Sequence, residues 1–456
     1  MRSLARTTAS SRVNHNDSDS EVIDPGKRRG PITMGLLWVT MVASFPAVLI
    51  GFDWYKEGFS LKQTIEALVL SMGVMLLYTV PIITLATKTG LSFKLLCKKF
   101  FGSQFSGRIT LCISILYMGW YAVMSLMMAD ATCGVLGCRQ YFPLLAFVFS
   151  FAMAFNNFFG FTGVANFARF IGAPVVIAWI VYIFGRVAPA IPSQITASHD
   201  TLPFYVAFFG ISQFILGYSI WGNEADYWRN GQVKPVKNAI AVASAQILGV
   251  IIFPLTGFLI ATQTGITNSA DATAYINTSS FGKAAVVGLL FLAAQYFASN
   301  DSNLYAFVHA VESFTKMSHR RVVSILALAA GLLAASLAVT GTQSALESIC
   351  ALNSVLLPTA TVLLVAEWLF FRKDERLESL SASKSAFFAW SAGVAIGILT
   401  SGVIPGLKGL SVGVPALQAW VVALMIYLPL RRRETSTSVI KLTIGRPELP
   451  VINDYA

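Results

Sequence analysis

The residues best suited to chemistry are amides, hydroxyls and one carboxylate within the apolar run FLAAQYFASNDSNLYAF, residues 291–307. At mid-bilayer depth an unpaired polar group costs several kcal/mol, and a charged one about 2.5–3.5 kcal/mol at a helix centre. On a helix, Tyr296 and Asn300 share one face, with Gln295 and Ser299 beside it. Such a face either joins neighbouring helices by hydrogen bonds or binds a substrate or an ion.

The composition indicates a membrane protein. A chain of 456 residues that is 55% hydrophobic and 12% charged, with a mean hydropathy of +0.66, is too apolar for a soluble protein. Its net charge of +11 would suggest a nucleic-acid partner in a soluble chain. Most of the 33 Lys and Arg residues lie instead in the tails and in alternate loops, which is the positive-inside pattern. We therefore expect no nucleic-acid partner and a multi-pass protein of the plasma or inner membrane with both termini cytoplasmic.

Twelve apolar windows follow one another, each about 20 residues long, the length that crosses about 30 Å of hydrocarbon. They lie at about 34–54, 62–87, 109–130, 141–159, 170–190, 204–223, 238–262, 283–307, 322–340, 346–370, 386–405 and 412–430. The expected division of the chain is a disordered cytoplasmic tail, a twelve-helix domain and a second cytoplasmic tail, at residues 1–33, 34–430 and 431–456.

Two windows contain helix-breaking residues. The first contains Ser44-Phe45-Pro46, where proline removes a backbone donor, and the sixth combines three glycines with polar side chains. In lipid the freed backbone groups must be satisfied, so breaks here would aim carbonyls and helix ends at a ligand; kinked packing helices are the alternative. The first and sixth helices correspond if residues 34–190 and 204–370 form an inverted repeat, with extra helices at 386–430, as in secondary transporters.

The third window carries an aromatic face formed by Tyr117, Trp120, Tyr121 and Met124. Such a stripe is usual in helix packing. A planar heterocyclic ligand, however, needs flat rings to stack against and a few amides to recognise its edge. Trp120 and Asn300 would supply both.

Five segments resemble signatures of the nucleobase:cation symporter-1 family, most closely those of the cytosine permease branch. They are TKTGLSFKLLCKKFFG (87–102), YMGWYAV (117–123), GNEADYWRNG (222–231), ASNDSNLYAF (298–307) and VAEWLFFRKDE (365–375). The resemblance covers about residues 34–430. It implies an all-α, LeuT-like fold with a 5+5 inverted repeat, broken helices 1 and 6, and two extra helices. It also implies uptake of a nucleobase by sodium or proton symport. We expect a monomer with no cofactor and no catalytic residue.

The resemblance places the substrate site on the third, sixth and eighth helices. The positions are Trp120, Tyr117, Asn300, Gly217, Tyr218 and Ser219. Trp120 would stack on the base and Asn300 would hydrogen-bond it. Tyr117 stands where cytosine permeases have a base-reading glutamine, and Gly217 where they have a second stacking aromatic. These departures leave hydroxymethylpyrimidine, hydantoin and allantoin as alternative substrates, and Trp221 is expected to contribute less than Trp120.

The resemblance also implies a cation site, at Phe45, Val48, Gln295, Ala298 and Ser299. Ala298 replaces a hydroxyl ligand, which weakens an oxygen site for sodium and favours protons, whereas the family favours sodium. Asp301 and Glu224 are the candidate proton carriers, because burial raises the proton affinity of a carboxylate.

Three further expectations concern the loops and the class of protein. Asp226 and Arg229, at the cytoplasmic end of the sixth helix, either form a gate or lie in a solvated loop. Cys133 and Cys138 share one external loop and either pair or remain free. The chain has no H-E-x-x-H or G-x-S-x-G motif and its four histidines are scattered, so we expect no enzyme. A channel or receptor is the alternative from a different class.

Overall fold

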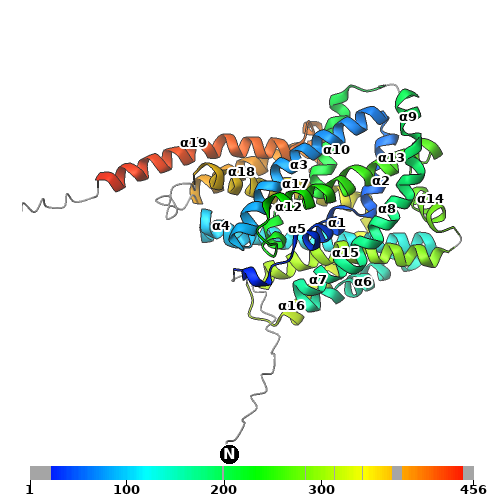
Figure 1. Ribbon diagram of the computed structural model, residues 1–456, viewed down its shortest axis with the longest axis horizontal. Helices are drawn as coiled ribbons and strands as arrows, with labels where there is room; N and C mark the ends of the chain where they lie inside the picture. Colours follow the sequence, from blue (N-terminus) through cyan, green and yellow to red (C-terminus); the bar gives the residue numbers. More distant parts are fainter. Residues whose placement is uncertain are drawn as a thin grey trace, which may run out of the picture.

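The computed structural model describes residues 22–197, 200–282, 284–312, 314–340, 342–371 and 383–444. Helices lie side by side along one long axis (Figure 1), and the described residues contain no β-strand, only an isolated bridge between Arg29 and Gly231. By length and composition, six helical segments of the described chain can cross a membrane, and one bent pair adds a seventh. Each of the twelve predicted windows coincides with a helix or a pair of helices. The predicted all-α membrane fold is confirmed.

In the first half of the chain, four α-helices precede the long helix α5 and four follow it. The bounds are α1 (Pro31–Val42), α2 (Phe45–Lys56), α3 (Leu61–Thr89), α4 (Phe93–Phe101), α5 (Ser103–Leu136), α6 (Phe142–Met153), α7 (Gly160–Phe167), α8 (Ala173–Val187) and α9 (Ile191–Ala197). The 3-10 segments η1 (Pro25–Lys27) and η3 (Phe155–Phe159) precede α1 and α7. Local signals fix several ends: Ser60 and Gln63 form a capping box at the start of α3, and Gly90, with φ of 68°, ends that helix.

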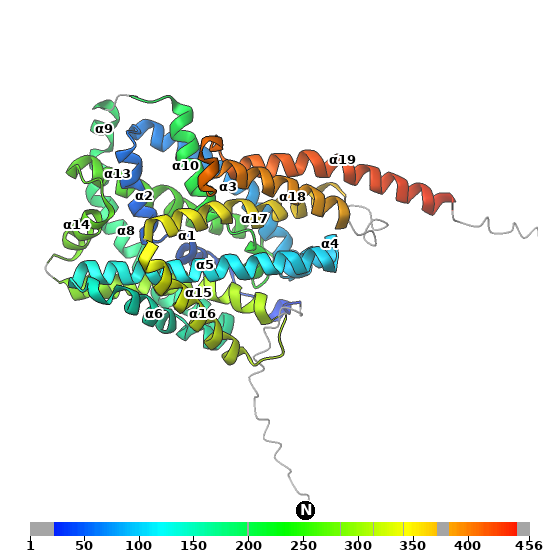
Figure 2. The ribbon, with the colours of Figure 1, turned by 180° about the vertical axis from the view of Figure 1, so that it is seen from behind.

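The second half contains the longest polar stretch of the interior, on α15. The bounds are α10 (Phe204–Ser219), α11 (Glu224–Trp228), α12 (Pro235–Gln246), α13 (Phe253–Thr264), α14 (Ser269–Phe281), α15 (Ala285–Glu312), α16 (His319–Thr340), α17 (Thr342–Phe370), α18 (Ser383–Thr400) and α19 (Pro415–Ile444). A π-helical turn, Ile247–Ile252, joins α12 to α13. Helices α18 and α19 pack on each other and on α17 (Figure 2).

Both predicted interruptions are present. Helices α1 and α2 meet at an angle of 46°, and between them Ala43 and Ser44 leave the helical conformation. Helix α10 ends at Ser219, Ile220 is extended, and Gly222 has φ of 85° before α11 begins. Each interrupted segment therefore consists of two half-helices joined by extended backbone.

Glycines allow α2 to pack unusually close to α13. A Cβ atom on Gly257 would lie 1.8 Å from the Val48 carbonyl oxygen, and one on Gly51 would lie 2.1 Å from the Pro254 oxygen. Membrane helices associate largely by such close packing of small residues. The second half of the broken first segment is thus fixed against α13.

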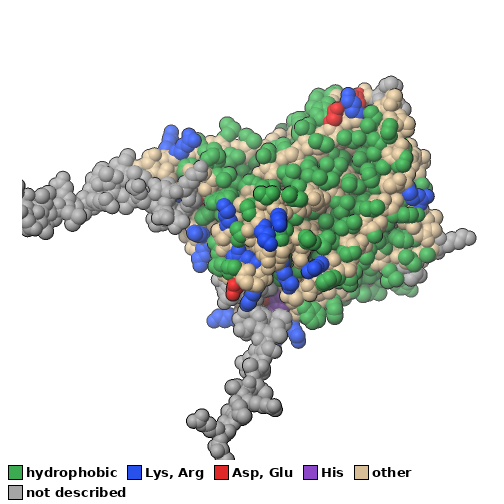
Figure 3. All heavy atoms as spheres, in the orientation of Figure 1, with side chains coloured by type: hydrophobic (Ala, Val, Ile, Leu, Met, Phe, Trp, Pro, Cys, Tyr) green, Lys and Arg blue, Asp and Glu red, His purple; other side chains and the backbone are tan. Residues whose placement is uncertain are grey.

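The two ends of the bundle differ in charge. Segment η1 and the end of α19 lie at the same end as α4, whereas α9 and α14 lie at the opposite end (Figure 1). On the face seen in Figure 3, most basic side chains gather at the α4 end, hydrophobic side chains predominate over the middle, and a few charged side chains lie at the opposite end. Basic side chains gathered at one end of the bundle are what the positive-inside pattern of the sequence predicts.

Candidate functional site

Two tryptophan rings lie side by side at the break in the sixth segment. Trp120 lies on α5 and Trp221 lies between α10 and α11, and both are buried. Their ring centroids are 6.3 Å apart and their planes differ by 15°. Tyr218 meets Trp120 edge-on at 5.8 Å, and Tyr117 lies 6.0 Å from Trp221. The result is an aromatic cluster with two nearly parallel walls.

Side chains of α17 satisfy the backbone that the break exposes. The Asn353 amide donates to the carbonyls of Gly217, at 3.0 Å, and Ile220, at 2.7 Å. The Thr361 hydroxyl donates to the Gly222 carbonyl. Irregular backbone is tolerated in a membrane only when its polar groups are paired in this way.

A buried carboxylate holds the other side of the same break. Glu224 accepts hydrogen bonds from the backbone N–H groups of Trp221, at 2.8 Å, and Gly222, at 3.1 Å. Its second oxygen accepts from the Tyr78 hydroxyl at 2.9 Å, and the Tyr78 ring stacks on Trp420. Glu224 therefore fixes the backbone that carries the second aromatic wall.

Asn300 joins three helices in this structure. Its amide nitrogen has the carbonyl of Tyr121 at 3.2 Å, the Ser125 hydroxyl at 3.3 Å and the Met153 sulfur at 3.1 Å as acceptors. Its amide oxygen accepts from Asn303 at 3.1 Å. These bonds link α15 to α5 and α6, as the packing interpretation of the polar run expects.

Gln295 presents an amide with free hydrogen-bonding capacity. Among the described residues, neither atom of its amide nor the Ser302 hydroxyl has a hydrogen-bond partner, although both side chains are buried. On α15 these two residues and Ser299 occupy the face between Tyr296 and Ala298. Buried polar groups in native proteins are nearly always paired, so this face is equipped to receive a polar ligand or a cation.

The break in the first segment lies close to that face. A Cβ atom on Gly172 would lie 2.5 Å from the Ala298 methyl and 3.0 Å from a Thr40 methyl, so the last turn of α1 and α15 converge there. The Val39 carbonyl of that last turn accepts from the Ala43 N–H at 2.8 Å, and beyond Ala43 the helix does not continue to pair the carbonyls that follow. Phe45 and Val48, the predicted carbonyl ligands, lie past the break in the first turn of α2.

The two candidate proton carriers have different surroundings. The carboxylate of Asp301 accepts from the side-chain amides of Asn156, at 2.7 Å, and Asn157, at 3.3 Å. These partners belong to η3, so Asp301 connects α15 to the segment between α6 and α7. Glu224 contacts the broken sixth segment itself.

Asp226 and Arg229 lie inside the protein and not in a solvated loop. Both are buried, and Asp226 belongs to α11. One Asp226 oxygen accepts from the backbone N–H of Phe93, which begins α4, at 2.7 Å. The other accepts from the Asn223 amide at 2.9 Å, and the Asn223 oxygen accepts from the Tyr117 hydroxyl. A chain of hydrogen bonds thus connects the aromatic cluster to α4.

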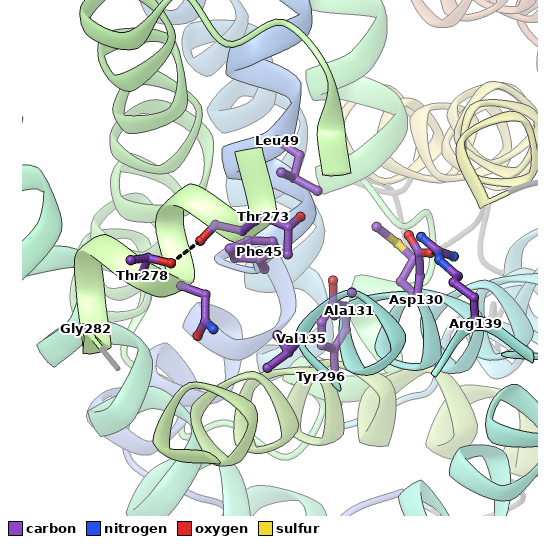
Figure 4. Close-up of a pocket in the computed structure, with 14 residues that line it drawn as sticks. Phe45, Leu49, Asp130, Ala131, Val135, Arg139, Thr273, Thr278, Gly282 and Tyr296 are labelled. Carbon is purple, nitrogen blue, oxygen red and sulfur yellow. Dashed lines mark hydrogen bonds and ion pairs between the residues drawn. The ribbon is translucent and has the colours of Figure 1, made fainter. Parts of the chain in front are cut away.

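A cavity of about 470 Å³ lies between α2, α5, α14 and α15 (Figure 4). Phe45 and the Tyr296 side chain line it from the first and eighth segments, and Tyr296 projects toward it. Asp130 and Arg139 form an exposed ion pair in its lining. The cavity therefore lies at the end of the bundle opposite to α4.

The sequence analysis expected a smaller contribution from Trp221 than from Trp120, whereas the structure places the two rings nearly parallel in one aromatic cluster. A usable signal was present, because Trp221 directly precedes Gly222 within the interrupted window. Cys133 and Cys138, which the sequence left either paired or free, are free thiols with their sulfurs 3.8 Å apart. The described residues contain no group of His, Cys, Asp and Glu that could hold a metal ion.

Comparison with solved structures finds this fold in membrane transporters. Mhp1, a nucleobase-cation-symport-1 family transporter, in a closed conformation with bromovinylhydantoin bound, matches with a TM-score of 0.68 at 16% identity, over 92% of this chain and 96% of that chain. Mhp1 in its inward-facing conformation gives 0.65 at 18% identity, over 91% and 92%. A substrate-bound, outward-open Na⁺-coupled sialic acid symporter gives 0.64 at 12% identity, over 90% and 91%. No protein-family model and no curated protein sequence matches the chain. The chain therefore shares the LeuT-like fold of these transporters.

Proposed function

We propose that the chain is a secondary active transporter of the nucleobase:cation symporter-1 family, which takes up a planar heterocycle with a cation by alternating access. The observation that carries the proposal is the nearly parallel arrangement of Trp120 and Trp221 across a broken helix. Both the sequence signatures and the shared fold support the family. In this proposal the protein is a monomer of the plasma or inner membrane, with both termini cytoplasmic.

The proposed substrate stacks between the two tryptophans. Their present separation of 6.3 Å is near the wide end of the range for aromatic contacts, about 4.5–7 Å, so a small displacement of the broken segment would admit a ring. Tyr117, Tyr218, Gly217 and Ser219 belong to the same cluster or to the helix end beside it.

Asn300 is the proposed amide that recognises the edge of the ring. One of its present acceptors is the Met153 sulfur, which is a weak acceptor. Exchanging that bond for one to a ring nitrogen or carbonyl oxygen is favourable. A nucleobase is the proposed substrate on the family signatures, and a hydantoin-like ring is the alternative that the bromovinylhydantoin complex of Mhp1 supports.

The proposed cation site lies where the end of α1 meets α15. Gln295 and Ser299 offer side-chain oxygens there, and the last turn of α1 offers carbonyls. Phe45 and Val48, in the first turn of α2 just past the break, remain proposed ligands beside this last turn. Sodium fits such an oxygen site, and the Na⁺-coupled sialic acid symporter supports sodium coupling. For protons, Glu224 is favoured over Asp301 because it contacts the wall of the substrate site.

Asp226 and Arg229 are proposed to close the α4 end. The hydrogen bonds that run from Tyr117 through Asn223 and Asp226 to α4 can couple a movement at the substrate site to a movement at the α4 end. Opening toward α4 would break the bond between Asp226 and Phe93 and expose buried charge.

The test is uptake by the purified protein in proteoliposomes, with radiolabelled uracil, cytosine, hypoxanthine and hydantoin competed against one another. We expect saturable uptake of one planar heterocycle, lost in Trp120→Ala and kept in Trp368→Ala, a half-buried tryptophan of α17 outside the cluster. Flux that does not saturate would indicate a channel and contradict the proposal.

A further inference from the structure

A second hollow lies on the outer surface of the bundle, between α1 and α12. It has a volume of about 500 Å³, and Ile177 of α8 lies at its edge. Apolar side chains line it, among them Ile32, Leu36 and Val39 of α1, Ile240 of α12 and Leu248 of the π-helical turn that follows α12. Ile32 and Ile240 are 76% and 60% exposed, so the groove opens outward onto the apolar surface of the bundle. None of the residues assigned to transport lines it.

The groove has the length of a single lipid leaflet. Its lining runs from Lys237 of α12 to Leu248 in the π-helical turn after α12, which corresponds to about 16 Å at about 1.5 Å per helical residue. Half of a hydrocarbon core about 30 Å thick is about 15 Å. An acyl chain that enters at one membrane surface would therefore reach the end of the groove near the bilayer midplane.

One end of the groove carries a positive charge, which favours a lipid with an anionic head group. Among the described residues that line it, Lys237 alone carries a charge, and it is exposed in the first turn of α12. Most of the basic side chains seen in Figure 3 gather at this end of the molecule, and hydrophobic side chains predominate over the middle of the face. A phosphate at the membrane surface would lie beside Lys237 while the chain attached to it fills the groove. We propose that this groove is a binding site for an anionic phospholipid.

A lipid bound in the groove would contact both α1 and α12, and so affect how α1 packs against α12. Gly35 lies against Ala241 of α12, and a Cβ atom on Gly35 would be 3.1 Å from the Ala241 methyl. The backbone of Arg29 also pairs with Asn230, at 2.6 Å, and with Gln232, at 2.9 Å. Because α1 is a half-helix that ends at the break, its movement against α12 would open the groove. A bound acyl chain contacts both helices and therefore stabilises the packed arrangement seen here.

The test is native mass spectrometry of the purified full-length protein titrated with phosphatidylglycerol or phosphatidylcholine. We expect one tightly retained phosphatidylglycerol. Lys237→Gln should weaken its binding about fivefold, the effect of one lysine near an anionic surface. Lys234→Gln, an exposed lysine one turn earlier that does not line the groove, is the matched control and should bind normally. Equal retention of both lipids, or no effect of Lys237→Gln, would overturn the head-group assignment.

A second pair of variants tests the groove itself. Ser244→Trp fills it from an exposed position on α12 and should abolish retention of the lipid. Ser324→Trp places the same side chain on the exposed surface of α16 and should leave retention unchanged. Undiminished retention in Ser244→Trp, or a dimer mass in place of the lipid adduct, would overturn the proposal. The Lys237→Gln comparison remains decisive if Ser244→Trp fails to insert.

Discussion

At the scale of residues, the central feature is the pair of nearly parallel rings of Trp120 and Trp221, and the carboxylate of Glu224 holds the backbone of Trp221. Trp120 sits on an unbroken helix, whereas the backbone of Trp221 is fixed by Glu224. Trp120 therefore lies on a continuous helix, and the Trp221 ring lies nearly parallel to it on an irregular segment that hydrogen bonds hold in place. In the proposed function, a small displacement of this one short segment admits a flat ligand between the two rings.

Removing the Trp221 ring should weaken binding of the proposed substrate. Stacking of a base on an aromatic side chain is worth about 1–3 kcal/mol, so Trp221→Ala should raise the dissociation constant about fivefold to a hundredfold. Trp221→Phe keeps a flat ring and should retain most of the affinity. Binding to detergent-purified protein measures both, and unchanged affinity in Trp221→Ala would remove Trp221 from the site.

A change at Glu224 separates its structural role from proton transfer. Glu224→Gln keeps an oxygen that can accept from Trp221 and Gly222 but cannot release a proton. If Glu224 carries the coupling proton, substrate binding should persist while uptake no longer responds to a pH gradient. Uptake that still follows the pH gradient in this variant would exclude Glu224 as the carrier.

The sequence predicted the environment of these residues better than their contacts. The polar run on α15 and the aromatic face of α5 are visible as patterns of residue type. The pairing of Trp120 with Trp221 depends on how the backbone turns between Ile220 and Gly222, which no helical periodicity describes. Hydrogen bonds from this polar face to neighbouring helices were one of the two expectations for it, but the sequence does not show that Asn300 bonds to α5 and α6 in particular.

At the scale of elements, both interrupted segments depend on local backbone chemistry. Ser44 and Pro46 start a new half-helix, and Gly222 supplies a left-handed conformation. The sequence located both breaks because proline and glycine mark them. It placed the charged stretch after the sixth segment in a loop because a helix as short as α11 has no hydrophobic period to recognise.

Gly222→Ala should disrupt the second break. A Cβ atom at this position would lie 2.2 Å from the Leu357 side chain, in addition to the cost of a left-handed alanine, on the order of 1 kcal/mol. Gly265→Ala has a similar φ of 72° with no atom within 4 Å and isolates the conformational cost. We expect uptake to be lost in the first variant and largely kept in the second. Equal effects on uptake and on melting temperature would show that crowding at the break is unimportant.

At the scale of the whole molecule, a buried ion pair joins the last two helices, α18 and α19, to helix α17 of the preceding bundle. Arg431 of α19 contacts Glu367 of α17 at 2.8 Å, and the Tyr427 hydroxyl donates to the same carboxylate at 2.7 Å. Both charged side chains are almost fully buried. The twelve hydrophobic windows predicted that these helices exist, but hydropathy alone does not show which charges meet.

Glu367→Gln leaves Arg431 without its main counter-charge. Breaking a buried pair from one side costs about 3–5 kcal/mol, so the melting temperature in detergent should fall clearly. Arg432→Gln removes the neighbouring exposed arginine and should leave the melting temperature unchanged. A fall of similar size in both variants would contradict a special role for the buried pair.

Cation-coupled uptake of a planar heterocycle is tested most directly by concentrative transport into proteoliposomes. The vesicles hold the purified protein, and a radiolabelled heterocycle is added at equal concentration on both sides. An imposed sodium gradient at equal pH, or a pH gradient without sodium, should drive accumulation above the outside concentration, and ionophores that collapse the gradient should abolish it. Equilibration without accumulation under both gradients would contradict symport.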